Sequence, residues 1–400
     1  MKFNPVAITA YTATCAVGRG RDALLQALRQ RRSGLKRYES RTGFESSDIE
    51  PKIDTWIGEV DGVNSITLPE AWSRFDCRNN RLAWLGLQGD GFLAAAQAAV
   101  ARHGATRVAV IIGTSTSGIL QAEHAFRTRE QDGLLPASFN YASTLNNYSA
   151  PSLIAEAAGA LGPTFAISTA CSSSAKVFAA AERLMRAGWI DAAIVGGVDS
   201  LCLTTLCGFG SLELLSREPC RPFDVARSGI SIGEGAGFAL LERNAKAPVM
   251  LRGVGESSDA HHMSTPHPQG LGAKLAMRGA LDAAGLQPDA VGYVNLHGTA
   301  TRSNDPSEGR AVAEVFNSVP TSSTKGWFGH LLGAAGIVES VVSLLALEHG
   351  LLPGTLNTTH VDPECPNAVL LDNEVRPIDV ALSNSFGFGG SNCSVIFGRP

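Results

Sequence analysis

A cysteine between a predicted strand and a predicted helix is the residue of this sequence best placed to act as a nucleophile. Cys171 lies in a run of small residues, 168–175, after the apolar stretch 165–167 and at the start of a helical pattern. Because the free amides and the dipole of a helix amino terminus favour negative charge, we expect the Cys171 thiol to ionise more easily than an ordinary cysteine. A thiolate is the reactive form in nucleophilic catalysis. The alternative for Cys171 is a small core residue, the usual role of a buried cysteine.

Two histidines occupy positions that suit proton transfer or hydrogen bonding to a reacting group. His297 ends the predicted strand 292–296, and side chains at such ends face the edge of the sheet where α/β proteins bind ligands. His330 stands at a predicted helix start, five residues after Lys325. Both histidines are therefore candidates for the same site as Cys171, although a hydrogen-bonded core histidine is the alternative for each.

Glycine concentrates next to these candidates. Residues 385–392 form a turn so rich in glycine that its amides are able to make an anion-binding nest, although a simple strand connection is the alternative. Gly329, Gly333 and Gly336 follow or flank His330, and the missing Cβ atoms let another backbone approach closely. Many of the 43 glycines thus belong to segments that also carry candidate functional residues.

A metal site is the less favoured interpretation of the remaining histidines and cysteines. His261, His262 and His267 lie in segment 259–267, whose proline and serine predict a loop without the carboxylate or cysteine spacing of a metal site. The eight cysteines form no Cys-x-x-Cys pair, which disfavours both a zinc site and a disulfide framework. We expect no metal and a reducing, cytoplasmic location.

Composition predicts a globular chain with a large core. Of its 400 residues, 44% are hydrophobic and 18% charged, which excludes a mainly disordered protein. The chain has 33 basic and 37 acidic residues, so it lacks the excess of positive charge that indicates nucleic acid binding. The apolar run 6–10 is too short for a signal peptide, and the longest uncharged stretch, 157–175, contains glycine and proline. We therefore expect neither export nor a membrane span.

The elements that must position these residues alternate between strands and helices. Short apolar runs at 108–112, 165–167 and 192–195 predict strands buried on both faces, and spacing of apolar residues predicts a helix over 172–188. After residue 245 the alternation restarts, with strands at 249–253, 292–296, 379–383 and 393–397 and helices at 274–284 and 334–347. No linker separates the halves, so the pattern predicts an α/β protein with two similar lobes sharing one core.

Four segments, taken in order, resemble the β-ketoacyl-acyl-carrier-protein synthases of the elongating type. They are Thr-Ala-Cys-Ser-Ser at 169–173, Asn-x-His-Gly-Thr-x-Thr at 295–301, Lys-x-x-x-Gly-His-Leu-Leu-Gly-Ala-Ala-Gly at 325–336 and Asn-Ser-Phe-Gly-Phe-Gly-Gly-Ser-Asn at 384–392. The resemblance covers the whole chain. It implies a thiolase-like fold of five αβαβα layers, whose halves are 1–245 with the nucleophilic cysteine and 246–400 with the two histidines, the lysine and the glycine-rich turn.

The resemblance also implies a role for each motif in a decarboxylative Claisen condensation. Cys171 takes an acyl group from acyl carrier protein, and His297 and His330 stabilise the enolate formed when a malonyl group loses CO₂. Lys325, supported by Glu339, holds the histidines in place. The backbone amides of Cys171 and Phe386 match the oxyanion hole. The substrates are carried on the phosphopantetheine of acyl carrier protein, and no other cofactor is implied.

The same resemblance implies the residues that bind the substrate. Thr299 and Thr301 match the positions that bind the pantetheine arm, and Phe386 matches a gate beside the acyl pocket. Phe388 lies in the same glycine-rich motif, and segment 259–267, which contains Ser264, resembles the family's substrate-entrance segment. Thr116 stands where chain-elongating synthases often carry a bulky aliphatic residue or glycine, and a buried hydroxyl needs a partner. A specialised pathway, such as aryl polyene or polyketide biosynthesis, therefore stands beside fatty acid elongation. Cys393 is interpreted as structural.

Two other functions compete with this interpretation. A cysteine-dependent acyl hydrolase would use Cys171 with one histidine and would leave the second histidine, Lys325 and the glycine turn unexplained. A non-catalytic partner resembling a chain length factor would lack the nucleophile, which this chain has. The resemblance implies a homodimer, and a heterodimer in which this chain is the active half stays open.

Overall fold

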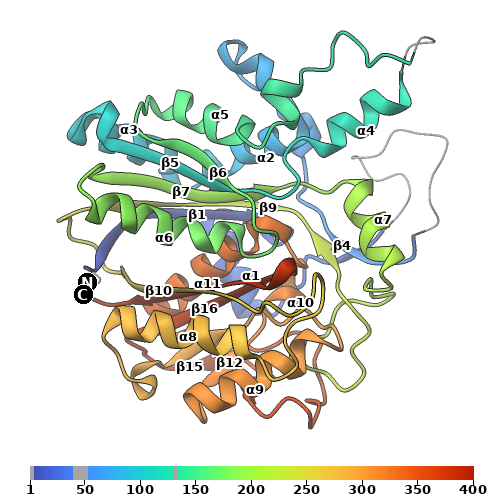
Figure 1. Cartoon of the computed structure of the whole chain (residues 1–400), viewed down its shortest axis with the longest axis vertical. Coiled ribbons are helices and arrows are strands. Elements are labelled where there is room, and N and C mark those ends of the chain that lie inside the picture. The colour runs from blue at the N-terminus through green and yellow to red at the C-terminus, as the bar shows by residue number, and fades with distance from the viewer. Residues whose placement is uncertain (1–3, 39–52, 130–132) are drawn as a thin grey trace.

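The computed structural model describes residues 4–38, 53–129 and 133–400; residues 1–3, 39–52 and 130–132, all in the predicted amino-terminal half, lie outside the described residues. Helices and sheets alternate in five layers, with a pair of helices between two sheets and further helices on both outer faces (Figure 1). The predicted αβαβα arrangement is confirmed. The division at residue 245 stays a prediction.

The amino-terminal sheet supplies the strand that leads to Cys171. Its strands are β1 (Val6–Cys15), β5 (Val108–Gly113), β6 (Thr164–Ile167), β7 (Ala192–Asp199) and β9 (Gly235–Glu242), in the spatial order β6-β5-β7-β9-β1. Strand β5 runs parallel to β6 and β7, whereas β9 runs antiparallel to β7 and β1. Strands β5, β7 and β9 are buried throughout because helices cover both faces of this sheet.

The carboxyl-terminal sheet repeats this topology. Its strands are β10 (Met250–Ser258), β11 (Tyr293–Asn295), β12 (Pro320–Ser322), β16 (Val380–Gly387) and β17 (Ser391–Gly398), in the order β10-β17-β16-β11-β12, with β14 (Ala368–Val369) beyond β12. Here β11 runs parallel to β12 and β16, and β17 runs antiparallel to β16 and β10. Strand for strand, the order and directions match those of the first sheet, so the two halves are pseudo-symmetric.

The two sheets meet where β1 pairs with β10, at Val6 with Leu251 and Ala7 with Met250. Helices α6 (Ser173–Arg186) and α11 (Ala335–His349) lie between the sheets, and α1 (Gly20–Gln30) packs against α11 and β1. Every residue of α11 from Ala335 to Leu347 is buried, since sheets cover it on two sides. Residues Leu332–His349 are long and apolar enough to cross a membrane, but 89% of that stretch is buried inside the protein, as in a core helix.

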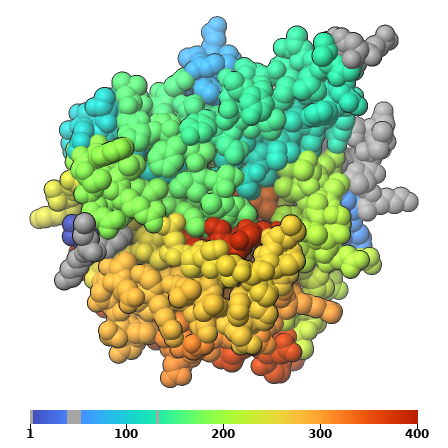
Figure 2. Space-filling model, in the orientation of Figure 1, coloured from blue at the N-terminus to red at the C-terminus, as the bar shows by residue number. Residues whose placement is uncertain are grey.

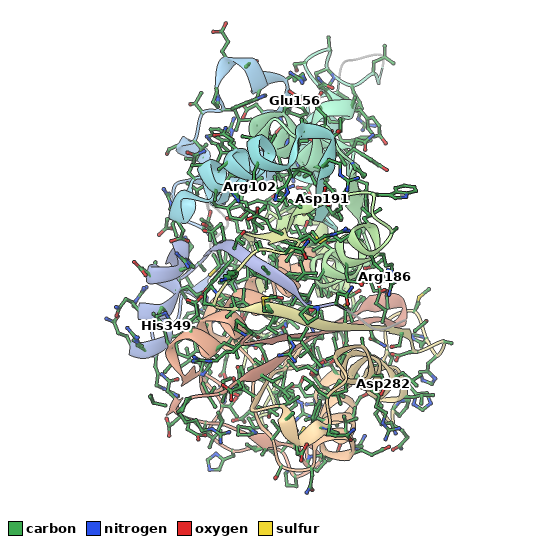
Figure 3. The ribbon with its side chains drawn as sticks, turned by 90° about the vertical axis from the view of Figure 1, so that its left-hand side faces the viewer. Arg102, Glu156, Arg186, Asp191, Asp282 and His349 are labelled. Atoms are coloured by element: carbon green, nitrogen blue, oxygen red, sulfur yellow. The ribbon has the colours of Figure 1, made fainter. Side chains whose placement is uncertain are left out.

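The outer layers complete the cover of each sheet. Helices α2 (Arg78–Leu87), α3 (Phe92–His103) and α5 (Ser149–Ala158) cover the amino-terminal sheet, and α8 (Leu271–Ala284) and α9 (Asn304–Phe316) cover the other (Figure 1). In the view turned by 90°, Arg102 and Glu156 lie on the outer helices of one half and Asp282 on α8 of the other (Figure 3).

Shorter elements connect or flank these layers. They are α4 (Ile119–Arg127), α7 (Leu203–Ser211), α10 (Lys325–Phe328) and the strands β2 (Gly18–Arg19), β3 (Lys36–Arg37), β4 (Trp56–Gly58), β8 (Ile232–Gly233), β13 (Leu351–Leu352) and β15 (Glu374–Val375). The sequence pattern did not predict these, nor α1 to α3, α5, α9, β9 and β12. The predicted strands and helices are all present, with ends shifted by up to five residues; β10, for example, continues to Ser258.

Candidate active site

Cys171 lies in a tight turn between β6 and α6. The turn is held by the Ser173 hydroxyl, which donates to Ala170 O at 2.5 Å and accepts from Thr169 N at 2.9 Å. Ala170, directly before the nucleophile, adopts a left-handed backbone with φ of 52°, an uncommon conformation for a residue with a side chain. The Cys171 side chain is therefore fixed at the amino end of α6, as the sequence predicted, and only 5% of the residue is exposed.

The ionisation of Cys171 differs from the sequence prediction. Burial raises the pKa of its thiol to about 11, although the Lys325 ammonium and the backbone N–H of Phe388 oppose this shift. The carboxylates of Glu339 and Asp199 raise the pKa further. The expectation of an easily ionised thiol is wrong for the free protein because loss of water outweighs the helix terminus. Cys171 therefore needs a proton acceptor when it attacks.

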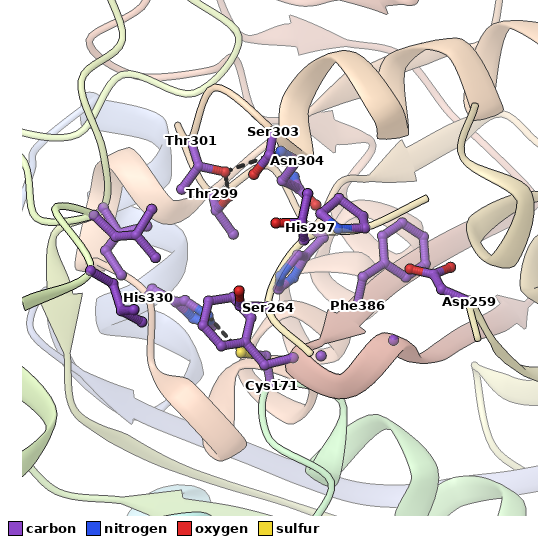
Figure 4. A pocket seen from close by; sticks show the side chains of 18 of the residues that line it. Cys171, Asp259, Ser264, His297, Thr299, Thr301, Ser303, Asn304, His330 and Phe386 are labelled. Carbon is purple, nitrogen blue, oxygen red and sulfur yellow. Dashed lines mark hydrogen bonds between the residues drawn. The ribbon is translucent and has the colours of Figure 1, made fainter. Parts of the chain in front are cut away.

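His330 is the group in contact with the Cys171 sulfur. Its Nε2 lies 3.0 Å from Cys171 Sγ (Figure 4). The His330 backbone is held in turn by a 2.7 Å hydrogen bond from its N–H to Ser231 O. Burial, and then the charge of Lys325, lower the pKa of His330 well below its usual range, so the imidazole is neutral. A neutral imidazole is able to accept the thiol proton or to donate a hydrogen bond.

His297 is held by a buried ion pair on its far side. Lys325 Nζ lies 3.5 Å from His297 Nδ1 and also donates to the carbonyl oxygen of the same residue. Glu339 Oε1 accepts from Lys325 Nζ at 2.5 Å, and both side chains are fully buried. Because the ammonium has only protons to give, His297 Nδ1 is the acceptor and its Nε2 carries the proton. Burial and the neighbouring Lys325 charge lower the pKa of His297 well below its usual range.

The two imidazoles converge on one space above the sulfur. Their ring centroids lie 5.3 Å apart at an interplanar angle of 85°, and both side chains point toward Cys171 in Figure 4. Within residues 4–38, 53–129 and 133–400, Cys171, His297 and His330 are the one group spaced to hold a metal ion, with ligand atoms within 4.8 Å of each other. The same arrangement also places two neutral hydrogen-bond donors beside a nucleophile.

A pocket with about 890 Å³ of empty space leads to these three residues. Thr299, Thr301, Ser264, Phe386 and Phe388 line it, as predicted from the sequence. The hydroxyls of Thr299 and Thr301 lie 2.9 Å apart and face the same space (Figure 4). Further lining residues were not predicted as site residues: Phe209, Leu212, Leu214, Ile230, Asp259, Asn304 and Asn392. Several of them lie in or after α7, whose apolar pattern alone gave no sign of a pocket.

The glycine-rich turn closes the pocket over the nucleophile. A Cβ at Gly387 would lie 2.6 Å from Thr169 O, so only glycine lets this strand end pack on the Cys171 turn. The Phe386 ring is buried, with its centroid 5.9 Å from that of His297, whereas Phe388 is 37% exposed and packs against Phe209 with centroids 5.6 Å apart. In the space-filling view, the red carboxyl-terminal segment reaches the surface between the two halves (Figure 2).

These observations can be set beside known proteins. A family model described as the N-terminal domain of β-ketoacyl synthase matches residues 3–247, and the model of the C-terminal domain matches residues 249–359. The chain belongs to the β-ketoacyl synthase family. It is an acyltransferase of the 3-oxoacyl-[acyl-carrier-protein] synthase class, a ketosynthase with the thiolase-like fold predicted from its motifs.

Curated relatives and solved structures match this ketosynthase, some of them over its full length. It is 31% identical to 3-oxoacyl-[acyl-carrier-protein] synthase 2 of Coxiella burnetii, over 100% of this chain and 99% of the relative. It is 41% identical to the mitochondrial synthase of Arabidopsis thaliana, over 60% of this chain and 57% of that protein. A chain in the solved complex of ketosynthase ApeO with its chain length factor ApeC from Xenorhabdus doucetiae matches with a TM-score of 0.89 and 37% identity. The match covers 99% of this protein and 98% of that chain.

The amide contributed by the glycine turn differs from the predicted one. The backbone N–H that reaches the Cys171 sulfur of this ketosynthase is that of Phe388, not that of Phe386. Phe386 instead stands within β16, opposite Asn392 of β17. Of the two aromatic rings, Phe388 is also the more exposed one at the pocket. The roles assigned to Phe386, oxyanion amide and gate, therefore fit Phe388 better.

Thr116 lies outside the pocket that the ketosynthase forms around Cys171. It is buried, and its hydroxyl donates to Asp199 Oδ1 at 2.8 Å and accepts from Ser200 N at 3.3 Å. The hydroxyl thus has the partners that a buried hydroxyl needs, but Thr116, expected at the acyl pocket, does not line it. Cys393 is buried in β17 between β16 and β10, as its structural interpretation requires.

The histidines of segment 259–267 do not form a cluster with metal spacing in the described residues. The His261 and His267 rings pack with centroids 5.2 Å apart, and His262 Nδ1 accepts from the backbone N–H of Ser264 at 3.2 Å. Ser264, Thr265 and Pro266 line the pocket. The segment thus forms one wall of the substrate pocket, which its resemblance to an entrance segment implied.

Proposed function

We propose that this ketosynthase condenses an acyl group on Cys171 with a malonyl group on acyl carrier protein and releases CO₂. Neutral His297 and His330, placed around the Cys171 sulfur in a buried pocket, carry this proposal. Two neutral donors suit an enolate oxygen, which gains negative charge only as the carboxylate leaves.

In the first half-reaction, the Cys171 sulfur attacks the carbonyl carbon of an acyl thioester. The bond from that carbon to the pantetheine sulfur breaks, and the thiol proton ends on the departing pantetheine. His330 Nε2, 3.0 Å from Sγ, is placed to relay this proton. The backbone N–H groups of Cys171 and Phe388 stabilise the negative charge that develops on the carbonyl oxygen.

In the second half-reaction, the bond between the malonyl carboxylate and the α-carbon breaks, and CO₂ leaves. The bonding electrons form an enolate whose oxygen accepts hydrogen bonds from Nε2–H of His297 and of His330. For this step neutral His330 carries its proton on Nε2, whereas it accepts the thiol proton as the Nδ1–H tautomer; its Nδ1 has no partner among the described residues that fixes either form. The enolate carbon attacks the Cys171 thioester, and the cysteine leaves as a thiolate that takes up one proton. Lys325 makes and breaks no covalent bond; it fixes the His297 tautomer from the far side of the ring.

The carriers and the cellular setting are part of the same proposal. Both substrates arrive on phosphopantetheine, the Thr299 and Thr301 hydroxyls bind that arm, and no other cofactor takes part. The full-length Coxiella relative is an acyl-carrier-protein synthase by name, which supports this choice. Within the described residues no disulfide joins the cysteines, which supports a reducing cytoplasm.

The partner and the pathway are inferred from similarity. We infer a specialised pathway, such as aryl polyene or polyketide biosynthesis, and a heterodimer with a homologue resembling a chain length factor. The ketosynthase in complex with its chain length factor is 37% identical to this chain, against 31% for 3-oxoacyl-[acyl-carrier-protein] synthase 2 of Coxiella burnetii, which matches over a similar length. A homodimer that elongates fatty acids is the alternative. Native mass spectrometry with and without the co-expressed homologue, followed by product analysis, separates the two.

One experiment tests the chemistry against both competing functions. The protein is incubated with acyl and malonyl carrier thioesters, and intact mass, CO₂ release and products are followed. We expect an acyl adduct that Cys171→Ala abolishes, CO₂ release and a product two carbons longer. Acyl release to water without CO₂ loss would establish the hydrolase instead. Absence of an adduct, or an adduct that survives Cys171→Ala, would establish the non-catalytic partner or another nucleophile.

A further inference from the structure

A buried carboxylate at the end of β7 collects an unusual number of hydrogen bonds close to the reacting groups. Asp199 is fully buried, and its carboxylate accepts from six donors. They are Thr114 Oγ1 at 2.8 Å, Ser115 N at 2.9 Å, Ser115 Oγ at 2.5 Å, Thr116 N at 2.9 Å, Thr116 Oγ1 at 2.8 Å and Gly333 N at 2.6 Å. All six donors are neutral.

These bonds join the two halves of the molecule beside the active site. Five donors come from the loop after β5, whereas Gly333 belongs to the turn that follows His330 by three residues. A Cβ at Gly333 would lie 2.7 Å from Asp199 Oδ2 and 2.9 Å from Ser115 N, so this turn is in close contact with the loop. Asp199 is therefore the acceptor that both segments share.

The turn that carries His330 needs such an anchor. Leu332, between His330 and Gly333, has a left-handed backbone with φ of 52°, which a leucine side chain disfavours. The bond from Gly333 N to Asp199 is charge-assisted and short at 2.6 Å. It therefore opposes relaxation of the turn, and with it any displacement of the His330 ring from the Cys171 sulfur.

We infer that Asp199 is a positioning residue: its carboxylate fixes the turn after His330 against the loop after β5 and so holds His330 on Cys171. The inference rests on the proposed condensation, because it assigns Asp199 to the step in which His330 acts. Asp199 has an electrostatic effect as well. Its negative charge raises the pKa of the Cys171 thiol, so positioning is achieved at the expense of thiol ionisation.

The two effects make opposite predictions for Asp199→Asn. The amide removes the negative charge and turns an NH₂ group toward N–H donors, which breaks the anchor. We expect kcat for malonyl decarboxylation to fall about tenfold, with KM for malonyl carrier thioester within about twofold, as for a lost transition-state contact. We expect alkylation of Cys171 by iodoacetamide at a fixed pH to become faster, because a neighbouring negative charge is gone.

Glu242→Gln is the matched control. Glu242 is also a buried carboxylate, bonded to Thr9, Arg102 and His103, at the opposite end of the β7 and β9 pair. The Glu242→Gln substitution should lower thermal stability. It should neither slow decarboxylation per folded molecule nor change the rate at which Cys171 is alkylated. If Asp199→Asn behaves like Glu242→Gln, the carboxylate is only structural and the inference is wrong.

A milder variant covers the case in which Asp199→Asn does not fold. Thr116→Val removes one donor and keeps the side-chain shape, so decarboxylation should slow by about two- to threefold while the charge near Cys171 persists. Unchanged decarboxylation in Thr116→Val would then overturn the inference.

Wild-type protein is assayed in parallel. If the wild type releases no CO₂, the proposed function fails. If the wild type is active and the variant is unaffected, only the role of Asp199 is contradicted.

Discussion

At the residue scale, the site combines a buried thiol with buried bases that stay neutral. Cys171 has a raised pKa, while His297 and His330 have lowered ones, so all three groups are uncharged near pH 7. On the reacting groups, negative charge therefore appears only during the reaction, when hydrogen bonds from the histidines and the backbone amides stabilise it. Glu339, behind His297, differs from these three groups because it titrates near neutral pH: burial raises its pKa to about 7, and the adjacent Lys325 opposes the shift.

The first prediction concerns the pH dependence of Cys171 reactivity. Only the thiolate is alkylated, so the rate with iodoacetamide should rise about tenfold per pH unit until the thiol pKa is reached. Since that pKa is about 11, the rise should continue throughout the range in which the protein stays folded. Lys325→Met should slow alkylation at any one pH, because the ammonium lowers this pKa. The Cys171→Ala variant gives the background, and a plateau below about pH 8.5, as for an ordinary cysteine, would contradict the prediction.

The second prediction separates the two half-reactions. His297→Ala should still allow Cys171 to be acylated, but decarboxylation should fall at least about a hundredfold, the usual effect of losing one oxyanion donor. Intact mass reports acylation, and CO₂ release reports decarboxylation. His349→Ala is the control, because His349 is exposed at the end of α11 (Figure 3). Loss of acylation with decarboxylation intact would reverse the assigned roles.

The sequence predicted the reacting side chains better than their surroundings. The quoted motifs contain Cys171, His297, His330 and Lys325, and Glu339 follows the third motif by three residues. The structure places all five in contact or close to each other. The partners of Thr116 and the choice between Phe386 and Phe388 depend on backbone directions that residue type does not determine. The Cys171 pKa was wrongly predicted because burial depends on layers contributed by distant segments.

At the element scale, the site depends on close contact between α6 and α11. Gly336 lies in the first turn of α11, where an added Cβ would be 2.6 Å from Ala175 N and 2.9 Å from Ala175 Cβ. Ile337 N also donates to Ser174 Oγ at 3.0 Å, near the start of α6. The helix that begins at the nucleophile and the helix that begins after His330 therefore hold each other in register.

The third prediction tests that contact. Gly336→Ala should reduce the free energy of unfolding by about 1–3 kcal/mol, the usual cost of overpacking, because backbone atoms of α6 cannot move aside easily. Denaturant unfolding measures the change. Gly208→Ala, in α7 where no atom lies within 4 Å of the added Cβ, should instead be neutral or stabilising by up to about 1 kcal/mol, from helix propensity. Equal effects of the two substitutions would show that the contact between α6 and α11 tolerates an added Cβ atom, which would contradict the prediction.

At the scale of the whole molecule, the two halves share their core. Helix α11 of the carboxyl-terminal half packs on β1 and β9 of the other half as well as on β16 of its own. The halves are also linked by the pairing of β1 with β10 and by Lys176 and Arg183 of α6, which approach Glu256 of β10. Repeated topology was predictable from the alternation of strands and helices, but this shared packing was not, because periodicity does not reveal which sheet covers a helix.

The fourth prediction follows from the shared core. Calorimetry should show one cooperative unfolding transition for the chain, and a fragment of residues 1–245 should lack one, because its sheet would expose the face that α11 covers. Two resolved transitions, or a fragment that unfolds cooperatively by itself, would contradict the prediction. Agreement of calorimetric and van't Hoff enthalpies is the quantitative check.

The convergence of both halves on one pocket has a genetic consequence. The nucleophile comes from the amino-terminal half and the histidines and Lys325 from the carboxyl-terminal half, but all of them belong to one polypeptide. Two inactive alleles, one lacking Cys171 and one lacking His297, therefore bring no complete set of reacting groups together in any mixed assembly. Co-expressing them should give no complementation, and activity should return only through recombination that places both residues on one chain.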